Sequence, residues 1–224
     1  MNKESNYKFI AVIPALNEES TIKDVINNLK NYVDEIIVVN DGSNDKTEKF
    51  AKQSGALVIN NYKQYGPEKA TDIGFKKAIE LKADYVITFD ADNQHPHSII
   101  PGFKKIILKE KIDIIVGKRE KFPRWSEYIF SIYSKFRTNI SDPINGFKII
   151  NSAVYKEIGF FDNIRGVTAQ IIFRAHKKKF LIKEFFIKIN KRKDNPRIGK
   201  SLIANTKIIS GLIRIIIDDI KSSL

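Results

Sequence analysis

Short apolar runs alternate with segments of helical spacing through the first half of the chain. The apolar runs have the length of buried strands, and we expect strands at 9–13, 35–39, 56–59, 85–89 and 112–116. Between them, apolar residues recur every three or four positions, which predicts helices at 21–32, 45–54, 67–81 and 98–109. Alternation of this kind predicts an α/β fold with a mainly parallel, doubly wound sheet that is covered by helices.

The second half of the chain has a less regular pattern. It predicts helices at 125–138, 152–158, 168–178 and 201–221, strands at 147–150 and 181–189, and a basic loop at 191–200. No internal repeat or linker divides the sequence, so we expect one domain over residues 1–224.

Composition narrows the class of protein. Of the 224 residues, 42% are hydrophobic, which is typical of a globular domain and excludes a disordered or fibrous one. The absence of cysteine excludes disulfides, thiolate zinc sites and a thiol nucleophile. Thirty-nine Lys and Arg against 26 Asp and Glu give a net charge of +13. That charge suits nucleotide phosphates, nucleic acid or anionic lipid, but it is equally compatible with a solvated lysine-rich surface.

Neither a signal peptide nor a membrane-spanning segment is predicted. The N-terminus is polar and leads directly into the first strand. A span needs about 20 consecutive apolar residues, and the nearest candidate, 202–220, is interrupted by Lys207, Arg214 and Asp218. We therefore expect a cytoplasmic protein.

Two carboxylates follow the fourth predicted strand. Asp90 and Asp92 are separated by one residue at the strand's end, where both can turn toward one cation. Oxygen ligands that leave room for phosphate oxygens suit Mg²⁺ or Mn²⁺, which would stabilise a departing diphosphate. The alternative is an acidic turn that caps the next helix. The position directly after a buried strand favours the metal site. His95 and His97 are interpreted as surface residues at that helix start, with contact of His95 to the metal site left open.

Two other strand ends carry polar loops. Asp41 and Gly42 follow the second strand, where a carboxylate can accept hydrogen bonds from a base or ribose and glycine allows close approach. Pro14 to Glu19 follows the first strand. Each loop taken alone is also good material for a turn or a helix start.

Together these loops resemble a known family. The strings Pro14-Ala-Leu-Asn-Glu-Glu19, Asn40-Asp-Gly-Ser43 and Asp90-Ala-Asp-Asn-Gln-His-Pro96 resemble those of the family 2 glycosyltransferases, which have the GT-A fold. Two further strings are similar to sequences in the branch that contains dolichyl- and polyprenyl-phosphate sugar transferases. They are Gly117-Lys-Arg119 and Ser141-Asp-Pro-Ile-Asn-Gly-Phe147. Arg197-Ile-Gly-Lys-Ser201 resembles a phosphate-contacting loop of that branch.

The resemblance implies a role for each matching residue. Residues 8–118 would form the half that binds the nucleotide sugar, and residues 119–224 the acceptor-side half. The implied nucleotide-binding residues are Pro14, Asn17, Glu18 and Asp41, and the implied metal ligands are Asp90, Asp92 and Gln94. The implied phosphate- or acceptor-binding residues are Arg119, Arg197, Lys200 and Ser201, and the implied catalytic residues are Asp92, Asp142 and Arg119. Leu16 departs from the family, because many relatives have Tyr there.

The implied reaction is inverting transfer of a sugar from a nucleotide-diphosphate sugar. A hydroxyl acceptor would need a base, for which Asp142 is the candidate, whereas a phosphate acceptor is already anionic and needs only positioning. The basic residues Arg119 and Arg197 to Lys200 favour a polyprenyl or dolichyl phosphate at the inner face of the membrane.

Three alternatives are weighed against this reaction. The first is a soluble transferase that acts on a saccharide hydroxyl in cell-surface glycan assembly. The second is a nucleotidyltransferase, which should carry a basic Gly-rich loop where this chain has the acidic 14–19. The third is a nucleic-acid-binding protein, which the acidic strand-end loops disfavour, so we expect no nucleic-acid partner.

Two helices carry apolar faces that the sequence alone does not assign. In the helix at 125–138, aromatic and Ile residues lie near basic ones, which suits either a membrane interface or ordinary core packing. In the last helix, Ile209, Ile213, Ile216 and Ile220 form a stripe that we assign to core packing or dimerisation.

Overall fold

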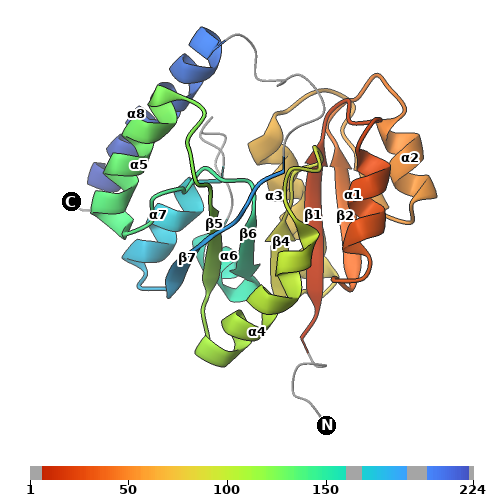
Figure 1. Ribbon diagram of the computed structural model, residues 1–224, viewed down its shortest axis with the longest axis horizontal. Coiled ribbons are helices and arrows are strands. Elements are labelled where there is room, and N and C mark those ends of the chain that lie inside the picture. The colour runs from red at the N-terminus through yellow and green to blue at the C-terminus, as the bar shows by residue number, and fades with distance from the viewer. Residues whose placement is uncertain (1–6, 160–167, 191–200, 222–224) are drawn as a thin grey trace.

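The framework of the protein is a seven-stranded sheet with strand order β3-β2-β1-β4-β6-β5-β7. The computed structural model describes residues 7–159, 168–190 and 201–221 (Figure 1). The strands are β1 (Phe9–Ala15), β2 (Glu35–Asn40), β3 (Leu57–Asn60), β4 (Tyr85–Thr88), β5 (Ile114–Lys118), β6 (Lys148–Asn151) and β7 (Ile182–Phe186). Helices cover both faces, which confirms the predicted doubly wound α/β fold (Figure 1).

Each face of the sheet has its own hydrophobic core. On one face, α1 (Ile22–Leu29), α2 (Thr47–Gln53) and α4 (Ile100–Glu110) pack on the strands. On the other face lie α3 (Pro67–Glu80), α6 (Ser152–Ile158) and α7 (Gln170–Lys177). Side chains of β1 alternate between the two cores, since Ala11 and Ile13 join the first and Ile10 and Val12 the second. Burial on both faces explains the continuous apolar runs that predicted the strands.

Strand direction brings the polar loops to one edge. β1 pairs in parallel with β2 and β4, and β2 pairs in parallel with β3. The loops after these strands therefore leave the same edge of the sheet, as the sequence predicts. The short strand expected at 147–150 is β6, which lies antiparallel between β4 and β5. Its entry loop, residues 139–147, consequently reaches the same edge from the opposite direction.

An outer layer of helices packs on α7, near the β5–β7 edge of the sheet. α5 (Trp125–Thr138) and α8 (Ser201–Lys221) pack with α7 around Phe130, Phe173 and Leu212. Ser126 Oγ donates to Asn205 Oδ1 at 2.6 Å near the helix starts. Arg137 Nε donates to Asp219 Oδ2 at 2.7 Å near the helix ends. The two helices therefore run side by side in the same direction, as Figure 1 shows at the left of the molecule. Within the described residues, no helix has the length and apolar character needed to span a membrane.

Close packing of α3 on β1 predicts the response to one substitution. A Cβ at Gly74 would lie 2.3 Å from Val12 Cγ1, inside the second core. Gly74→Ala should lower the free energy of unfolding by about 1–3 kcal/mol, because overpacking outweighs the gain in helix propensity. Urea unfolding followed by circular dichroism measures the change.

Gly102→Ala in α4 is the matched control. A Cβ there meets nothing within 4 Å, so the propensity gain of roughly 0.5–1 kcal/mol should appear as added stability. Equal effects of the two substitutions would contradict the proposed packing.

Candidate active site

The loops after β1 and β2 are joined by hydrogen bonds. The Asn17 backbone N–H donates to Ser43 Oγ at 2.9 Å, and Asn44 N–H donates to Asn17 Oδ1 at 2.8 Å. Asn17 adopts a left-handed backbone conformation with φ of 52°, which asparagine tolerates better than most residues. Pro14 is half-buried in β1, and its register partner is Val39. Two of the predicted nucleotide-binding residues thus belong to one connected edge.

Glu18 is buried behind this edge. Its backbone N–H donates to Thr47 Oγ1 at 2.7 Å, and Thr21 Oγ1 donates to its Oε2 at 3.0 Å. These contacts fix the start of α1 against α2. In the described structure, Glu18 therefore serves as an anchor of the loop, and its predicted nucleotide contact stays a prediction.

Asp41 organises the loop that follows β3. Its Oδ1 accepts from Asn61 Nδ2 at 2.8 Å and from Tyr65 N–H at 3.0 Å, and its Oδ2 accepts from Gly66 N–H at 2.8 Å. The side chain is 3% exposed. Asp41 thus holds two exposed aromatic rings, Tyr65 and the neighbouring Tyr62, next to the predicted nucleotide pocket.

Gly42 permits this close approach. Its φ is 77°, and a Cβ would lie 3.0 Å from the backbone of Lys63 and Gln64. Any other residue would be both strained and crowded there. The predicted need for glycine after Asp41 is therefore explained by packing of the loop at 61–66.

Asp90 lies at the end of β4 beside a buried histidine. Its Oδ2 is 2.8 Å from His95 Nε2, and its side chain is 45% exposed. The removal of water by surrounding protein raises the pKa of Asp90, but the hydrogen bond from His95 and the charges of His95, Lys148 and Arg119 outweigh it. The net pKa is lowered, so Asp90 is ionised at neutral pH. His95 is 3% exposed, so interpreting it as a surface residue was wrong.

Asp92 and Gln94 complete the turn after Asp90. Asp92 Oδ1 accepts from Gln94 N–H at 3.1 Å, and Asn93 between them has a left-handed φ of 60°. Gln94 also meets the chain that leaves β7, because Asn190 N–H donates to the Gln94 carbonyl at 2.8 Å. The polypeptide thus passes the predicted metal ligands just before it enters the segment 191–200.

The residues around Asp90 fit a divalent cation. Two carboxylates and an amide oxygen form a hard oxygen donor set, which Mg²⁺ and Mn²⁺ prefer. Gly146 packs directly against the Asp90 carboxylate, since a Cβ on it would lie 2.1 Å from Asp90 Oδ2. Among the described residues, no cluster of three or more His, Cys, Asp and Glu side chains could hold a metal. The metal site predicted at Asp90, Asp92 and Gln94 therefore stays a prediction.

Arg119 and Asp142 form a bidentate ion pair. Arg119 Nε lies 2.8 Å from Asp142 Oδ2, and its Nη2 lies 2.8 Å from Asp142 Oδ1. Arg119 Nη1 lies 2.9 Å from Glu127 Oε2, and Arg124 binds the other oxygen of Glu127 at 2.8 Å. Burial would lower the pKa of Arg119, but the hydrogen bond and charge of Asp142 outweigh it and raise the pKa.

Exposure separates the roles of the two partners. Asp142 is fully buried, whereas the Arg119 side chain is 15% exposed. Both Asp142 oxygens already accept from Arg119. This geometry favours Asp142 as the residue that orients Arg119, and its predicted role as a base stays a prediction.

A buried network positions the loop that carries Asp142. Glu184 on β7 accepts from the backbone N–H groups of Ser141 and Asp142, at 2.8 and 2.6 Å. Lys148 on β6 is fully buried and donates to the Asn145 carbonyl and to Thr168 Oγ1. Burial lowers the pKa of Lys148 to about 8, against the opposing charges of Asp142 and Asp90.

The structure therefore brings most of the predicted site residues to one edge. The predicted residues found there are Pro14, Asn17, Glu18, Asp41, Asp90, Asp92, Gln94, Arg119 and Asp142. Arg197 and Lys200 lie outside the described residues, as does the side chain of Ser201, whose backbone begins α8.

Glu127, Glu184 and Lys148 were missed by sequence reasoning. Glu127 is an ordinary charged residue in an amphipathic helix, and Glu184 and Lys148 stand in short strand-like segments. A charged residue inside an apolar strand was the one available signal, and Lys148 within 147–150 carries it.

Comparison with known proteins identifies the family of this chain. The model of glycosyl transferase family 2 matches residues 10–159. The UDP-N-acetylglucosamine–dolichyl-phosphate N-acetylglucosaminyltransferase of Methanococcus voltae is 38% identical over 131 residues, which cover 50% of this chain and 52% of that protein. The dolichol-phosphate mannosyltransferase of Pyrococcus furiosus is 26% identical over 92% of this chain and 64% of its own length. The matches thus span about half to two thirds of these relatives.

A solved structure shares the fold. Glucosyl-3-phosphoglycerate synthase from Mycobacterium tuberculosis, in complex with Mn²⁺, UDP and glucosyl-3-phosphoglycerate, superposes with a TM-score of 0.76. The superposition covers 95% of this chain and 81% of that chain, at 22% sequence identity. The predicted GT-A architecture is confirmed. With the family model matching most of the chain, from β1 to the end of α6, this protein belongs to glycosyl transferase family 2.

Proposed function

We propose that the protein transfers a sugar from a nucleotide-diphosphate sugar to a polyprenyl or dolichyl phosphate. One observation supports this proposal above the others. Carboxylates suited to a metal–diphosphate unit and a guanidinium suited to a second phosphate, that of Arg119, share one edge of the sheet. The names of the two dolichyl-phosphate relatives point to the same acceptor class.

The donor would bind across the loops after β1, β2 and β4. Asp41, Asn17 and the rings of Tyr62 and Tyr65 would surround the nucleoside. A tyrosine from the loop at 61–66 would supply the ring that Leu16 lacks. Asp90, Asp92 and Gln94 would hold Mg²⁺ or Mn²⁺, which neutralises the diphosphate as it departs.

The transfer would be a direct displacement. An oxygen of the acceptor phosphate attacks the anomeric carbon, and the bond from that carbon to the diphosphate oxygen breaks with inversion. The nucleoside diphosphate leaves with the bonding electron pair. The acceptor oxygen is already anionic, so no proton must be removed, and Arg119 would hold the acceptor in line.

A panel of nucleotide sugars tests the proposed function directly. Purified protein is mixed with UDP- or GDP-sugars, Mg²⁺ or Mn²⁺, and polyprenyl phosphate in detergent. We expect lipid-linked sugar and nucleoside diphosphate in equal amounts, and none after chelation of the metal. Transfer to a soluble saccharide or to phosphoglycerate instead of the lipid would contradict the proposed acceptor. It would still support the proposed nucleotide-sugar donor.

Loss of one carboxylate tests the proposed metal site. Asp92→Asn preserves the size of the side chain but removes a charge, and turnover should fall at least about a hundredfold, or about 3 kcal/mol of transition-state stabilisation. Asp24→Asn, on the exposed side of α1, is the matched control and should retain full activity. Near-normal turnover of folded Asp92→Asn protein would contradict the proposed role of Asp92 as a metal ligand.

The pH profile separates the two roles considered for Asp142. In Asp142→Asn, transfer should fall at least about tenfold because Arg119 loses its orientation, while the shape of the pH–rate profile persists. Disappearance of one limb of the profile would instead make Asp142 a base. Asp219→Asn removes a carboxylate from an ion pair with Arg137 and Lys177, away from the site, and controls for lost stability.

A further inference from the structure

The outward face of α5 is its most apolar face. Its exposed large side chains recur at helical spacing, so they lie on one stripe along the helix. They are Trp125, Tyr128, Ile129, Ile132 and Phe136. Phe136 is 85% exposed and Tyr128 is 60% exposed.

The inward face of α5 is instead built mainly from small and polar residues. Phe130 is its one large buried hydrophobic residue. Its other buried residues are Ser126, Glu127, Ser131, Ser134 and Thr138. A helix that packs on a protein core normally buries its large apolar side chains and exposes its polar ones. This inversion indicates that something apolar covers the outer face.

α8 continues the same surface. It runs beside α5, and it too exposes large apolar side chains: Leu202, Ile203, Ile213, Ile217 and Ile220. A groove of about 470 Å³ at the first part of both helices is lined by residues that include Trp125, Leu202, Ile209 and Ile213. Most of the exposed large hydrophobic residues of the described chain lie on these two helices. Patches of this kind mark interaction sites.

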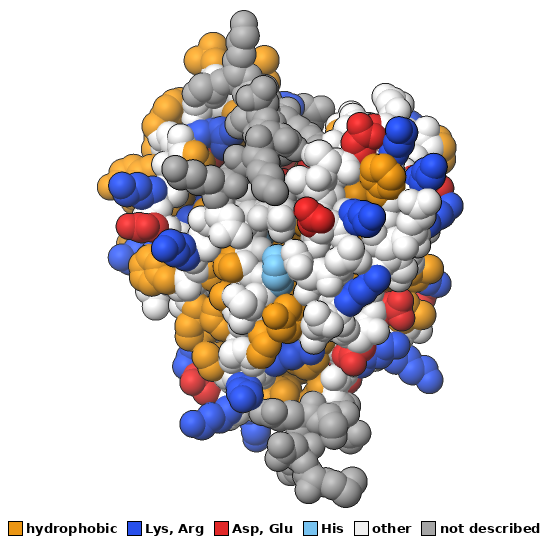
Figure 2. Space-filling view, turned by 45° about the vertical axis from the view of Figure 1, so that its right-hand side comes forward, with side chains coloured by type: hydrophobic (Ala, Val, Ile, Leu, Met, Phe, Trp, Pro, Cys, Tyr) orange, Lys and Arg blue, Asp and Glu red, His pale blue; other side chains and the backbone are white. Residues whose placement is uncertain are grey.

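The charge on this surface is mostly positive. Lys135, Lys207 and Arg214 are exposed beside the apolar stripes. Asp219 is buried and pairs with Arg137 and Lys177, and Asp218 lies 3.3 Å from Arg174. Along the left edge of Figure 2, on the side that carries α5 and α8, hydrophobic side chains lie among Lys and Arg side chains.

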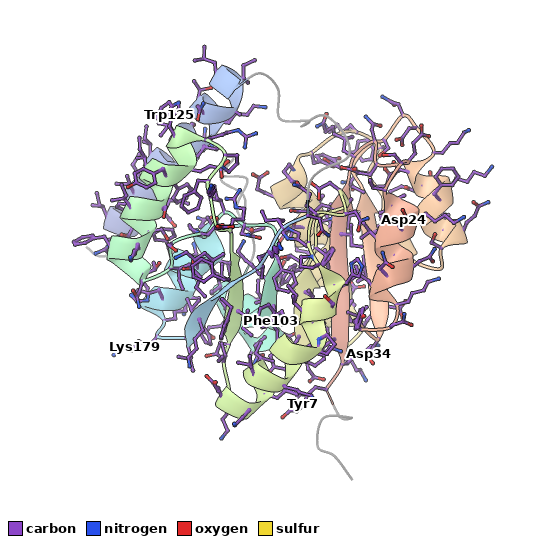
Figure 3. All side chains as sticks on the ribbon, in the orientation of Figure 1. Tyr7, Asp24, Asp34, Phe103, Trp125 and Lys179 are labelled. Atoms are coloured by element: carbon purple, nitrogen blue, oxygen red, sulfur yellow. The ribbon has the colours of Figure 1, made fainter. Side chains whose placement is uncertain are left out.

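Trp125 links this surface to the active-site edge. Figure 3 shows it at the end of α5 where α8 begins, at the same end of the molecule as the carboxyl ends of the parallel strands. The preceding residue, Arg124, binds Glu127, which binds Arg119. Whatever covers the α5–α8 face therefore lies close to the acceptor side of the site.

We propose that the α5–α8 face docks on a lipid bilayer that contains anionic headgroups. Apolar stripes bordered by Lys and Arg match the acyl boundary and the anionic headgroups of a membrane surface. A protein partner fits less well, because Lys is depleted in protein interfaces. Docking would hold the acceptor side of the site at headgroup level. The proposal does not depend on the transfer reaction, because neither donor nor acceptor is needed for docking.

Trp125 gives a direct readout, because it is the only tryptophan of the chain. Wild-type protein is titrated with vesicles of phosphatidylcholine alone or with phosphatidylglycerol added. We expect a blue shift of Trp125 emission and quenching by brominated acyl chains, with anionic vesicles binding more tightly and high salt weakening the binding. Absence of a shift, or binding without quenching by brominated chains, would overturn insertion of this face.

Matched variants test which residues carry the binding. Phe136→Ser combined with Ile132→Ser should weaken vesicle binding at least about tenfold, because it removes apolar contact with the bilayer. The control is Phe186→Ser on β7, which removes an equally prominent ring that is 71% exposed. Equal losses in the two variants would contradict a localised docking face.

Charge variants and oligomeric state complete the test. Lys207→Gln with Arg214→Gln should reduce the preference for anionic vesicles, whereas Lys23→Gln with Lys49→Gln on α1 and α2 should not. Sedimentation without lipid is measured in parallel. A stable dimer that Phe136→Ser dissociates, without vesicle binding by the wild type, would assign the face to a second copy of the chain and overturn the proposal.

Discussion

The geometry of the candidate site depends on the bidentate ion pair between Arg119 and Asp142. Arg119 follows β5, and Asp142 lies on the loop that enters the antiparallel strand β6. Asp142 is completely buried, and removal of one partner from such a pair leaves an uncompensated charge. The loop with Asp142 is therefore tied to β5, to β7 through Glu184, and to β4 through the hydrogen bond from Thr88 to Gly146. That loop in turn packs Gly146 against the Asp90 carboxylate.

Neighbouring opposite charges keep both Asp90 and Arg119 ionised at this edge of the sheet. Asp90 is kept ionised by His95, Lys148 and Arg119, and Arg119 is kept cationic and oriented by Asp142 and Glu127. Opposite charges are thus held close together, and the side chains of Asp90 and Arg119 remain partly exposed. Such preorganised charge is suited to a reaction in which a metal-bound diphosphate leaves and an anionic acceptor arrives.

The layer formed by α5 and α8 is packed differently from the sheet. In the sheet, both faces are apolar because helices cover both. In α5, the polar face is turned inward, where Ser126 and Glu127 bind Asn205, Arg119 and Arg124. The site needs these polar contacts, and the large apolar residues are consequently left on the outside.

The sequence predicted the fold, and the edge at which most candidate site residues lie, because the information was local. Buried strands appear in the sequence as apolar runs. Because the strands were predicted to be parallel, the polar loops at their ends could be assigned to one edge of the sheet. It also predicted β6, but the antiparallel insertion of that strand between β4 and β5 came only from the structure. Pairing between distant strands leaves no mark in short-range periodicity.

Contacts between residues far apart in the sequence decided the features that local patterns do not reveal. The sequence treated Asp142 and Arg119 as separate functional groups, and only the fold made them one ion pair across 23 positions of the chain. His95 was interpreted as exposed because histidine before a helix usually is, yet the turn after β4 buries it against Asp90. The hydrophobic period of α5 and α8 predicted two amphipathic helices. Which side faces the protein was decided by tertiary structure, because periodicity fixes the stripe but not its partner.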